Sequence, residues 1–184
     1  MLEDYLKNLR EKLSYIDLIT YFLANFKKIC KVDDFVSEFQ SKVFDVTDTP
    51  EIQVTRSMEQ TYPDEQGYSF VFQEDNRFSG VFDLDFIENA VANFRAQLFA
   101  KGFFASSKMN KKYDSVLEFM MNKYGRGIDK LHVYDKIWYD RNKGLVISVR
   151  KLKWPRPSIS FTITAENFAQ SVIYLIQARE LEQG

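Results

Sequence analysis

The chain has 184 residues, of which 45% are hydrophobic and 28% are charged, and its formal net charge is −1. These values exclude a largely disordered chain and predict a single domain, with a helical N-terminal segment over residues 1–32. A single cysteine, Cys30, excludes an internal disulfide, and one cysteine with one histidine excludes the usual zinc ligand sets.

The N-terminal third is predicted to be mostly helical. Apolar residues recur at helical spacing over residues 2–31, and Ser14 has the character of a helix N-cap, so two helices are expected there. One long bent helix is the alternative. A third helix is predicted to begin at Asp33 or Asp34. Residues 51–55 alternate polar and apolar side chains and predict a half-buried strand.

The middle of the chain predicts a hairpin followed by a helix. Aromatic-rich runs at 68–74 and 78–83 flank a polar turn, which is typical of a β-hairpin. Asp85, with Glu88 three residues later, resembles a capping box. We therefore expect a helix from Asp85 that ends at Gly102, a residue suited to helix termination.

The last third predicts the same order of elements. Disorder is expected only at the ends of the chain and over residues 106–112. In chain order the predicted elements are a helix at 114–124, strands at 131–139, 145–152 and 158–163, and a helix that opens at Thr164.

The order helix, three strands, helix thus occurs over 33–102 and again over 113–182. An ancient duplication would produce this repeated order, and so would a common α+β arrangement that occurs twice by chance. Either way the predicted class is α+β, with antiparallel β-hairpins packed against helices.

Catalytic motifs are scarce. The glycines are scattered and form no phosphate-binding loop, and the single histidine, His132, has no nucleophile motif near it. Asp83 and Asp85, with Glu74 and Asp75, would make an acid cluster for Mg²⁺ in a metal-dependent hydrolase, although caps and turns account for these acids. We expect no catalytic residue, metal or cofactor, and keep the hydrolase as an alternative.

Charge is sorted along the chain, which bears on partners rather than on fold. Residues 33–88 contain 14 acidic and 3 basic residues, a net charge of −11, and residues 101–156 contain 14 basic and 5 acidic residues, a net charge of +9. Both segments are therefore candidate binding surfaces.

The acidic segment favours a protein partner, since carboxylates speed encounter with a basic protein and aromatic side chains anchor it. The leading prediction is a non-enzymatic protein-binding protein, inhibitory or neutralising, such as an immunity-type protein or a phage-encoded inhibitor. The residues assigned to this surface are Asp45, Asp48, Glu51, Glu59, Asp64, Glu65, Tyr62 and Tyr68.

The basic segment favours nucleic acid as the alternative partner, because cations neutralise phosphates and aromatic rings stack on bases. Cations that protect strand edges, or a basic half covered by the acidic half, would explain the same residues. The residues assigned to this surface are Lys111, Lys112, Arg126, Arg150, Lys151, Lys153, Trp154 and Arg156.

No targeting segment is expected. The N-terminus is acidic, and the most apolar stretch, residues 15–29, is interrupted by charged side chains, so it is too short and too polar to span a bilayer. The prediction is a cytoplasmic protein with no membrane partner. The oligomeric state is left open.

Overall fold

The computed structural model describes residues 2–47, 65–131, 133–153 and 156–183. The helices are α1 (Leu2–Leu6), α2 (Tyr15–Asn25), α3 (Val32–Phe39), α5 (Ala105–Tyr124) and α6 (Gln170–Gln183), with short 3₁₀ turns at Phe26–Lys28 and Glu166–Phe168. The strands are β1 (Val43–Asp45), β2 (Glu65–Gln73), β3 (Phe78–Ile87), β4 (Ala90–Ala100), β5 (Ile128–Asp129), β6 (Lys136–Asp140), β7 (Leu145–Leu152) and β8 (Ser158–Ala165).

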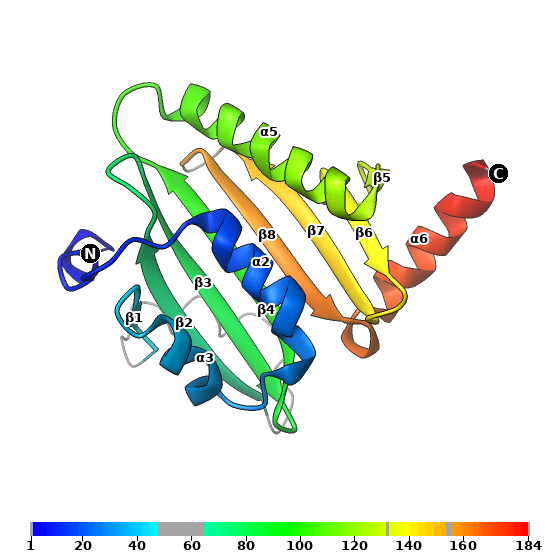
Figure 1. Cartoon of the computed structure of the whole chain (residues 1–184). Coiled ribbons are helices and arrows are strands. Elements are labelled where there is room, and N and C mark those ends of the chain that lie inside the picture. Colours follow the sequence, from blue (N-terminus) through cyan, green and yellow to red (C-terminus); the bar gives the residue numbers. More distant parts are fainter. Residues whose placement is uncertain (1, 48–64, 132, 154–155, 184) are drawn as a thin grey trace.

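These strands form one antiparallel sheet of eight in the described part of the chain (Figure 1). Their order is β1-β2-β3-β4-β8-β7-β6-β5. Two runs of sequential neighbours therefore meet at the β4–β8 pair, where Arg95 lies opposite Thr162. The predicted α+β class is confirmed.

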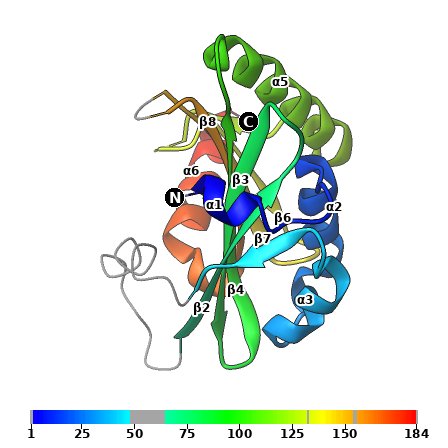
Figure 2. The ribbon, with the colours of Figure 1, turned by 90° about the vertical axis from the view of Figure 1, so that its left-hand side faces the viewer.

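Helices α2, α3 and α5 cover one face of the sheet, and α6 lies on the other side (Figure 2). The main core lies under the three helices, because alternate residues of the strands point there. Phe82, Phe94 and Phe161 have no exposed surface, and Phe22 of α2 stacks on Phe94 with ring centroids 4.0 Å apart. The aromatic content of the sequence is thus concentrated between the helices and the sheet.

The helix predicted from Asp85 to Gly102 is wrong, since this stretch contains the end of β3 and the whole of β4. Glu88 and Asn89 both have positive φ, 50° and 60°, and make the tight turn that joins the two strands. Asp85 lies within β3 and caps no helix. Residues 93–98 pair with β3 on one side and with β8 on the other. Their buried and half-buried side chains alternate strictly, as expected for a central strand.

Because β4 is a strand, the helix–three-strands–helix order predicted for 33–102 is not present as proposed. Each run of sequential strands has four members, β1 to β4 and β5 to β8. The duplication itself stays a hypothesis.

Some of the other predicted element boundaries are confirmed, and others differ in the structure. Ser14 caps α2, with the Asp17 N–H donating to its Oγ at 3.4 Å, and both predicted hairpins are present. Residues 106–112 are not disordered but form the first turns of α5, because Met109 in this polar stretch is buried. Thr164 belongs to β8 and does not open the last helix, and the strand predicted at 51–55 lies outside the described residues. None of the described helices combines the length and apolar character needed to cross a bilayer.

Candidate binding face of the sheet

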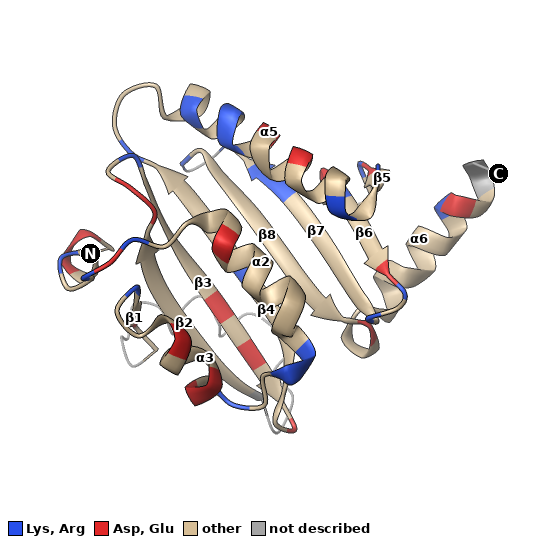
Figure 3. Cartoon of the chain, viewed as in Figure 1, with Lys and Arg blue, Asp and Glu red and all other residues tan. Residues whose placement is uncertain are grey.

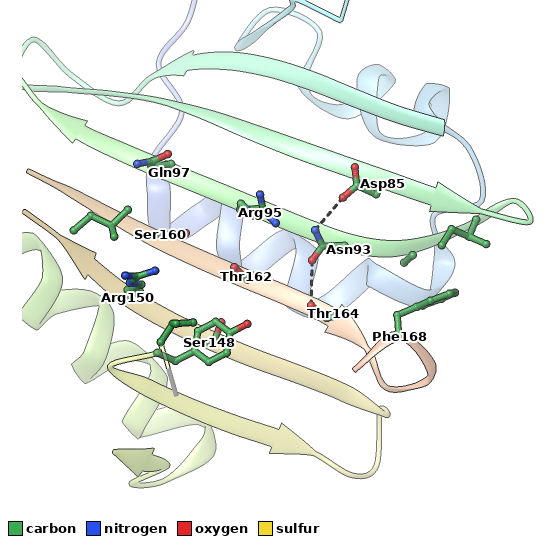
Figure 4. A pocket seen from close by; sticks show the side chains of 15 residues that line it. Asp85, Asn93, Arg95, Gln97, Ser148, Arg150, Ser160, Thr162, Thr164 and Phe168 are labelled. Carbon is green, nitrogen blue, oxygen red and sulfur yellow. Dashed lines mark hydrogen bonds between the residues drawn. The ribbon is translucent and has the colours of Figure 1, made fainter. Parts of the chain in front are cut away.

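The face of the sheet opposite α2, α3 and α5 is only partly covered by the described residues, and we call it the open face. At one side α6 buries Ile173 and Ile176 against Ile137 and Val146 of β6 and β7. Across β4, β8 and the far end of β7 no described helix lies over the face, and a shallow hollow of about 520 Å³ remains (Figure 4). It is lined by Asp85, Ile87, Ala92, Asn93, Arg95, Gln97, Val133, Tyr134, Ser148, Arg150, Leu152, Ser160, Thr162, Thr164 and Phe168.

The strand register arranges the polar side chains of this hollow in rows that cross the sheet. One row runs from Arg95 through Thr162 to Ser148, because these residues are directly paired across β4, β8 and β7. The next row runs from Gln97 through Ser160 to Arg150. Neighbouring strands lie about 4.8 Å apart, so each row places three hydrogen-bonding side chains along roughly 10 Å.

A third row is tied together by hydrogen bonds. The Asn93 amide donates from Nδ2 to Asp85 Oδ2 at 3.0 Å, and the Thr164 hydroxyl donates to Asn93 Oδ1 at 3.1 Å (Figure 4). Asn93 therefore connects β3 to β8 through side chains, in addition to the backbone ladder. Such a chain of bonds fixes the orientation of the polar groups.

Charges of both signs share the open face. Asp83 and Asp85 project from β3, with Asp83 accepting a hydrogen bond from the Ser69 hydroxyl at 2.5 Å. Arg95 lies directly opposite Asp83 in the ladder. Arg150 is exposed at the far side, on β7, and makes no ion pair with another described residue. The face thus changes from acidic on β3 to basic on β7.

The four carboxylates considered for a metal site are not brought together. Glu74 and Asp75 lie in the turn before β3, whereas Asp85 lies near the strand's other end, about 23 Å from the start of β3 at 3.3 Å per residue. Glu74 is paired with Lys112 at 2.5 Å, and Asp75 with Arg77 at 2.8 Å. In the described ranges no group of three or more His, Cys, Asp or Glu residues could hold a metal ion.

Most of the predicted acidic surface lies where the structure describes nothing. Asp48, Glu51, Glu59, Tyr62 and Asp64 are outside the described residues, and Glu65 is placed only as a backbone position at the start of β2.

The two remaining residues of that surface, Asp45 and Tyr68, lie in the described part of the chain. Asp45 is exposed at the end of β1, where its carboxylate accepts the Thr47 N–H at 2.8 Å. Tyr68 is half-buried and packs edge-on against Phe86. Their assignment to a protein-binding surface stays a prediction.

The predicted basic residues are divided among several surfaces (Figure 3). Arg150 lies on the open face, and Lys151, its neighbour, lies on the helix-covered side with its Nζ 4.9 Å from the centre of the Tyr113 ring. Lys112 is mostly buried in its pair with Glu74.

The others are exposed at separate places, and Trp154 lies outside the described residues. Lys111 is on α5, Arg126 is just past its C-terminus, Lys153 follows β7, and Arg156 borders a hollow beside α1. The seven described residues of this set do not form one continuous basic surface.

Sequence reasoning missed the β4 residues of the open face, Asn93, Arg95 and Gln97. The prediction of a helix over this stretch concealed them. The signal that identifies them is the alternation from Asn93 to Leu98, in which every second side chain is polar.

Comparison of the chain with protein-family models, curated proteins and solved structures finds no match. The function is therefore argued from the geometry of this molecule.

Proposed function

We propose that this chain is a non-enzymatic binding protein that docks another polypeptide on the open face of its sheet. The observation that carries the proposal is the half-covered sheet itself. One face is packed under three helices, while the other carries ordered rows of hydroxyl, amide and charged side chains over β4, β8 and β7, most of them half-buried and Arg150 exposed.

The mixture of charges favours a polypeptide over a nucleic acid on this face. Asp83 and Asp85 would repel a phosphate backbone, whereas a protein surface offers partners of both signs. An acidic side chain of the partner would lie near Arg150, and a basic one near Asp85. The hydroxyl and amide groups between them both donate and accept hydrogen bonds, as polypeptide backbone and side chains require.

The inhibitory or neutralising role predicted from the acidic segment remains part of this proposal, although the docking surface moves to the open face. A partner held over β4, β8 and β7 would have the contacting part of its own surface covered. The expected partner presents a small polar patch of mixed charge rather than a purely basic one.

The test is capture of partners from the native cell by the tagged chain, compared between two charge-reversal variants. Arg150→Glu changes the open face, and Lys123→Glu makes the same change on the exposed surface of α5. A partner that is captured by the native chain and by Lys123→Glu, but lost with Arg150→Glu, supports the proposal. Equal capture by both variants contradicts it.

A further inference from the structure

Two adjacent phenylalanines project into solvent at one end of the sheet, in the loop between β4 and α5. Phe103 is 90% exposed and Phe104 is 82% exposed, although most phenylalanines of this chain are buried in the core. Exposed apolar side chains that lie side by side, unlike single ones, can form the contiguous apolar patch typical of an interaction site. We call Phe103 and Phe104 the aromatic tip.

The backbone holds the aromatic tip in a defined position. The Lys101 N–H donates to the Arg77 carbonyl oxygen at 2.7 Å, which ties the loop to the β2–β3 turn. On the other side, the Lys108 N–H donates to the Phe104 carbonyl oxygen at 3.0 Å. Phe104 has a φ of +61°, a conformation that costs about 1 kcal/mol for a residue other than glycine. The loop accepts this strain while leaving both rings exposed.

A cationic hollow of about 400 Å³ lies along the first turns of α5, and one of its lining residues, Lys108, is bonded through its N–H to Phe104 of the tip. Its lining includes Lys108 and Lys111 from the first turns of α5, together with Lys112 and Arg77. Figure 3 shows basic positions, in blue, in the first turns of α5.

The acidic side chains in the hollow are already neutralised. Glu74 is paired with Lys112, and the Asp75 carboxylate accepts the Arg77 guanidinium at 2.8 Å. Lys108 and Lys111 are therefore cations in excess beside the aromatic tip.

We propose that this end of the molecule binds single-stranded nucleic acid, independently of the open face. Phosphates would lie along the hollow near Lys108 and Lys111, and unpaired bases would stack on Phe103 and Phe104. A single strand is required because the bases of a duplex are already stacked on one another and cannot reach an isolated ring. The site keeps only Lys111 and Lys112 of the basic surface predicted from the sequence, and its rings come from a different loop.

The experiment measures the affinity for a labelled oligothymidine single strand by fluorescence anisotropy, over a series of salt concentrations. We expect binding that weakens steeply as salt rises. Phe103→Ala and Phe104→Ala should each weaken binding about tenfold, through lost stacking. A duplex of the same length should bind more weakly.

A matched pair of lysine variants separates a local site from a general charge effect. Lys111→Ala should lower the slope of log affinity against log salt by about 0.7. Lys123→Ala, also exposed on α5 but about 18 Å along the helix, should leave the slope unchanged. Lys111 and Lys123 are both exposed, so circular dichroism should show that both alanine variants are folded.

Several outcomes would overturn the proposal. They are absence of binding at low salt, equal affinity after both phenylalanine changes, and equal slopes for the two lysine variants. A further arm uses vesicles with anionic headgroups, because exposed phenylalanines beside lysines also suit a membrane surface. Vesicle binding that depends on Phe103 and Phe104, without oligonucleotide binding, would assign the tip to lipid instead.

Discussion

Arg150 and Lys151 are neighbours in β7, yet their side chains leave opposite faces of the sheet. Arg150 lies on the open face in the row of Gln97 and Ser160, whereas Lys151 lies over the Tyr113 ring and donates to the Asn110 side chain at 3.2 Å. A run of basic residues in a strand is therefore not a basic patch, because successive side chains point to opposite faces. This relationship divides the most basic segment of the chain between two surfaces.

The ion pair between Glu74 and Lys112 should contribute measurably to stability. Their side chains are only 12% and 19% exposed, and Glu74 also accepts the Tyr15 N–H at 3.1 Å. Lys112→Met leaves this carboxylate without its counter-charge, and we expect the free energy of unfolding in urea to fall by about 2 kcal/mol.

The matched control for this pair is Arg77→Met. It removes a pair whose arginine is 66% exposed, so the loss should stay below about 1 kcal/mol. Losses of equal size in the two variants would show that burial does not strengthen the Glu74–Lys112 pair.

Two glycines with positive φ should differ in their tolerance of alanine. At Gly102, with φ +71°, an added Cβ meets no atom within 4 Å, so Gly102→Ala should cost about 1 kcal/mol from backbone strain alone. At Gly127, with φ +67°, the Cβ would lie 2.6 Å from Trp138 Nε1. Gly127→Ala should cost about 3 kcal/mol and change the tryptophan fluorescence. Thermal unfolding of both variants checks this, and similar melting temperatures would contradict it.

Tyr15 should limit stability at alkaline pH. Burial, followed by the negative charge of Glu74, raises the pKa of this phenol well above its ordinary value of 10.0. The folded state keeps the proton that the unfolded state loses, so this contribution is complete below pH 10 and is lost as pH rises above it.

The measurement compares the native chain with Tyr15→Phe. The variant loses the hydrogen bond from the hydroxyl to the Ala96 carbonyl oxygen at 2.9 Å, which should cost about 1 kcal/mol near neutral pH. Its stability should then fall less steeply between pH 10 and 12. Parallel declines would show that Tyr15 ionises as readily in the folded state as in the unfolded one.

Asn93 should matter for docking more than for folding. Its amide connects Asp85 to Thr164, but all three side chains are half-buried and can exchange these bonds for water. Asn93→Leu should therefore change the unfolding free energy by about 1 kcal/mol or less while reducing partner capture strongly. Unchanged capture at unchanged stability would remove this row from the docking surface.

The sequence predicts those elements whose ends are marked by nearby residues, such as a helix cap or a polar turn. Ser14 caps α2 as expected, and the polar turn between β2 and β3 was recognised from its sequence. The stretch from Val91 to Leu98 was misassigned because its apolar residues fit a helix as well as a strand, and Asp85 with Glu88 imitated a cap. Pairing with β3 and β8 makes this stretch a strand, and the residues of the stretch alone do not reveal that pairing.

The open face could not be predicted for the same reason. Arg95 and Thr162 are separated by 67 positions and become neighbours only through the β4–β8 ladder. Among the described residues, strand alternation and pairs such as Glu74–Lys112 distribute the charges of the acidic and basic segments over several surfaces. The register of the strands decides which side chains lie together on one face, and composition carries no information about register.

The most direct test of the docking proposal places a photo-crosslinking amino acid at Thr162, in the centre of the open face, and in a second variant at Glu118, exposed on α5. Both proteins are irradiated in extracts of the native cell. The account predicts a discrete adduct with another polypeptide from position 162 and none from position 118. Adducts of the same polypeptide from position 118 alone, or from both positions equally, would contradict it.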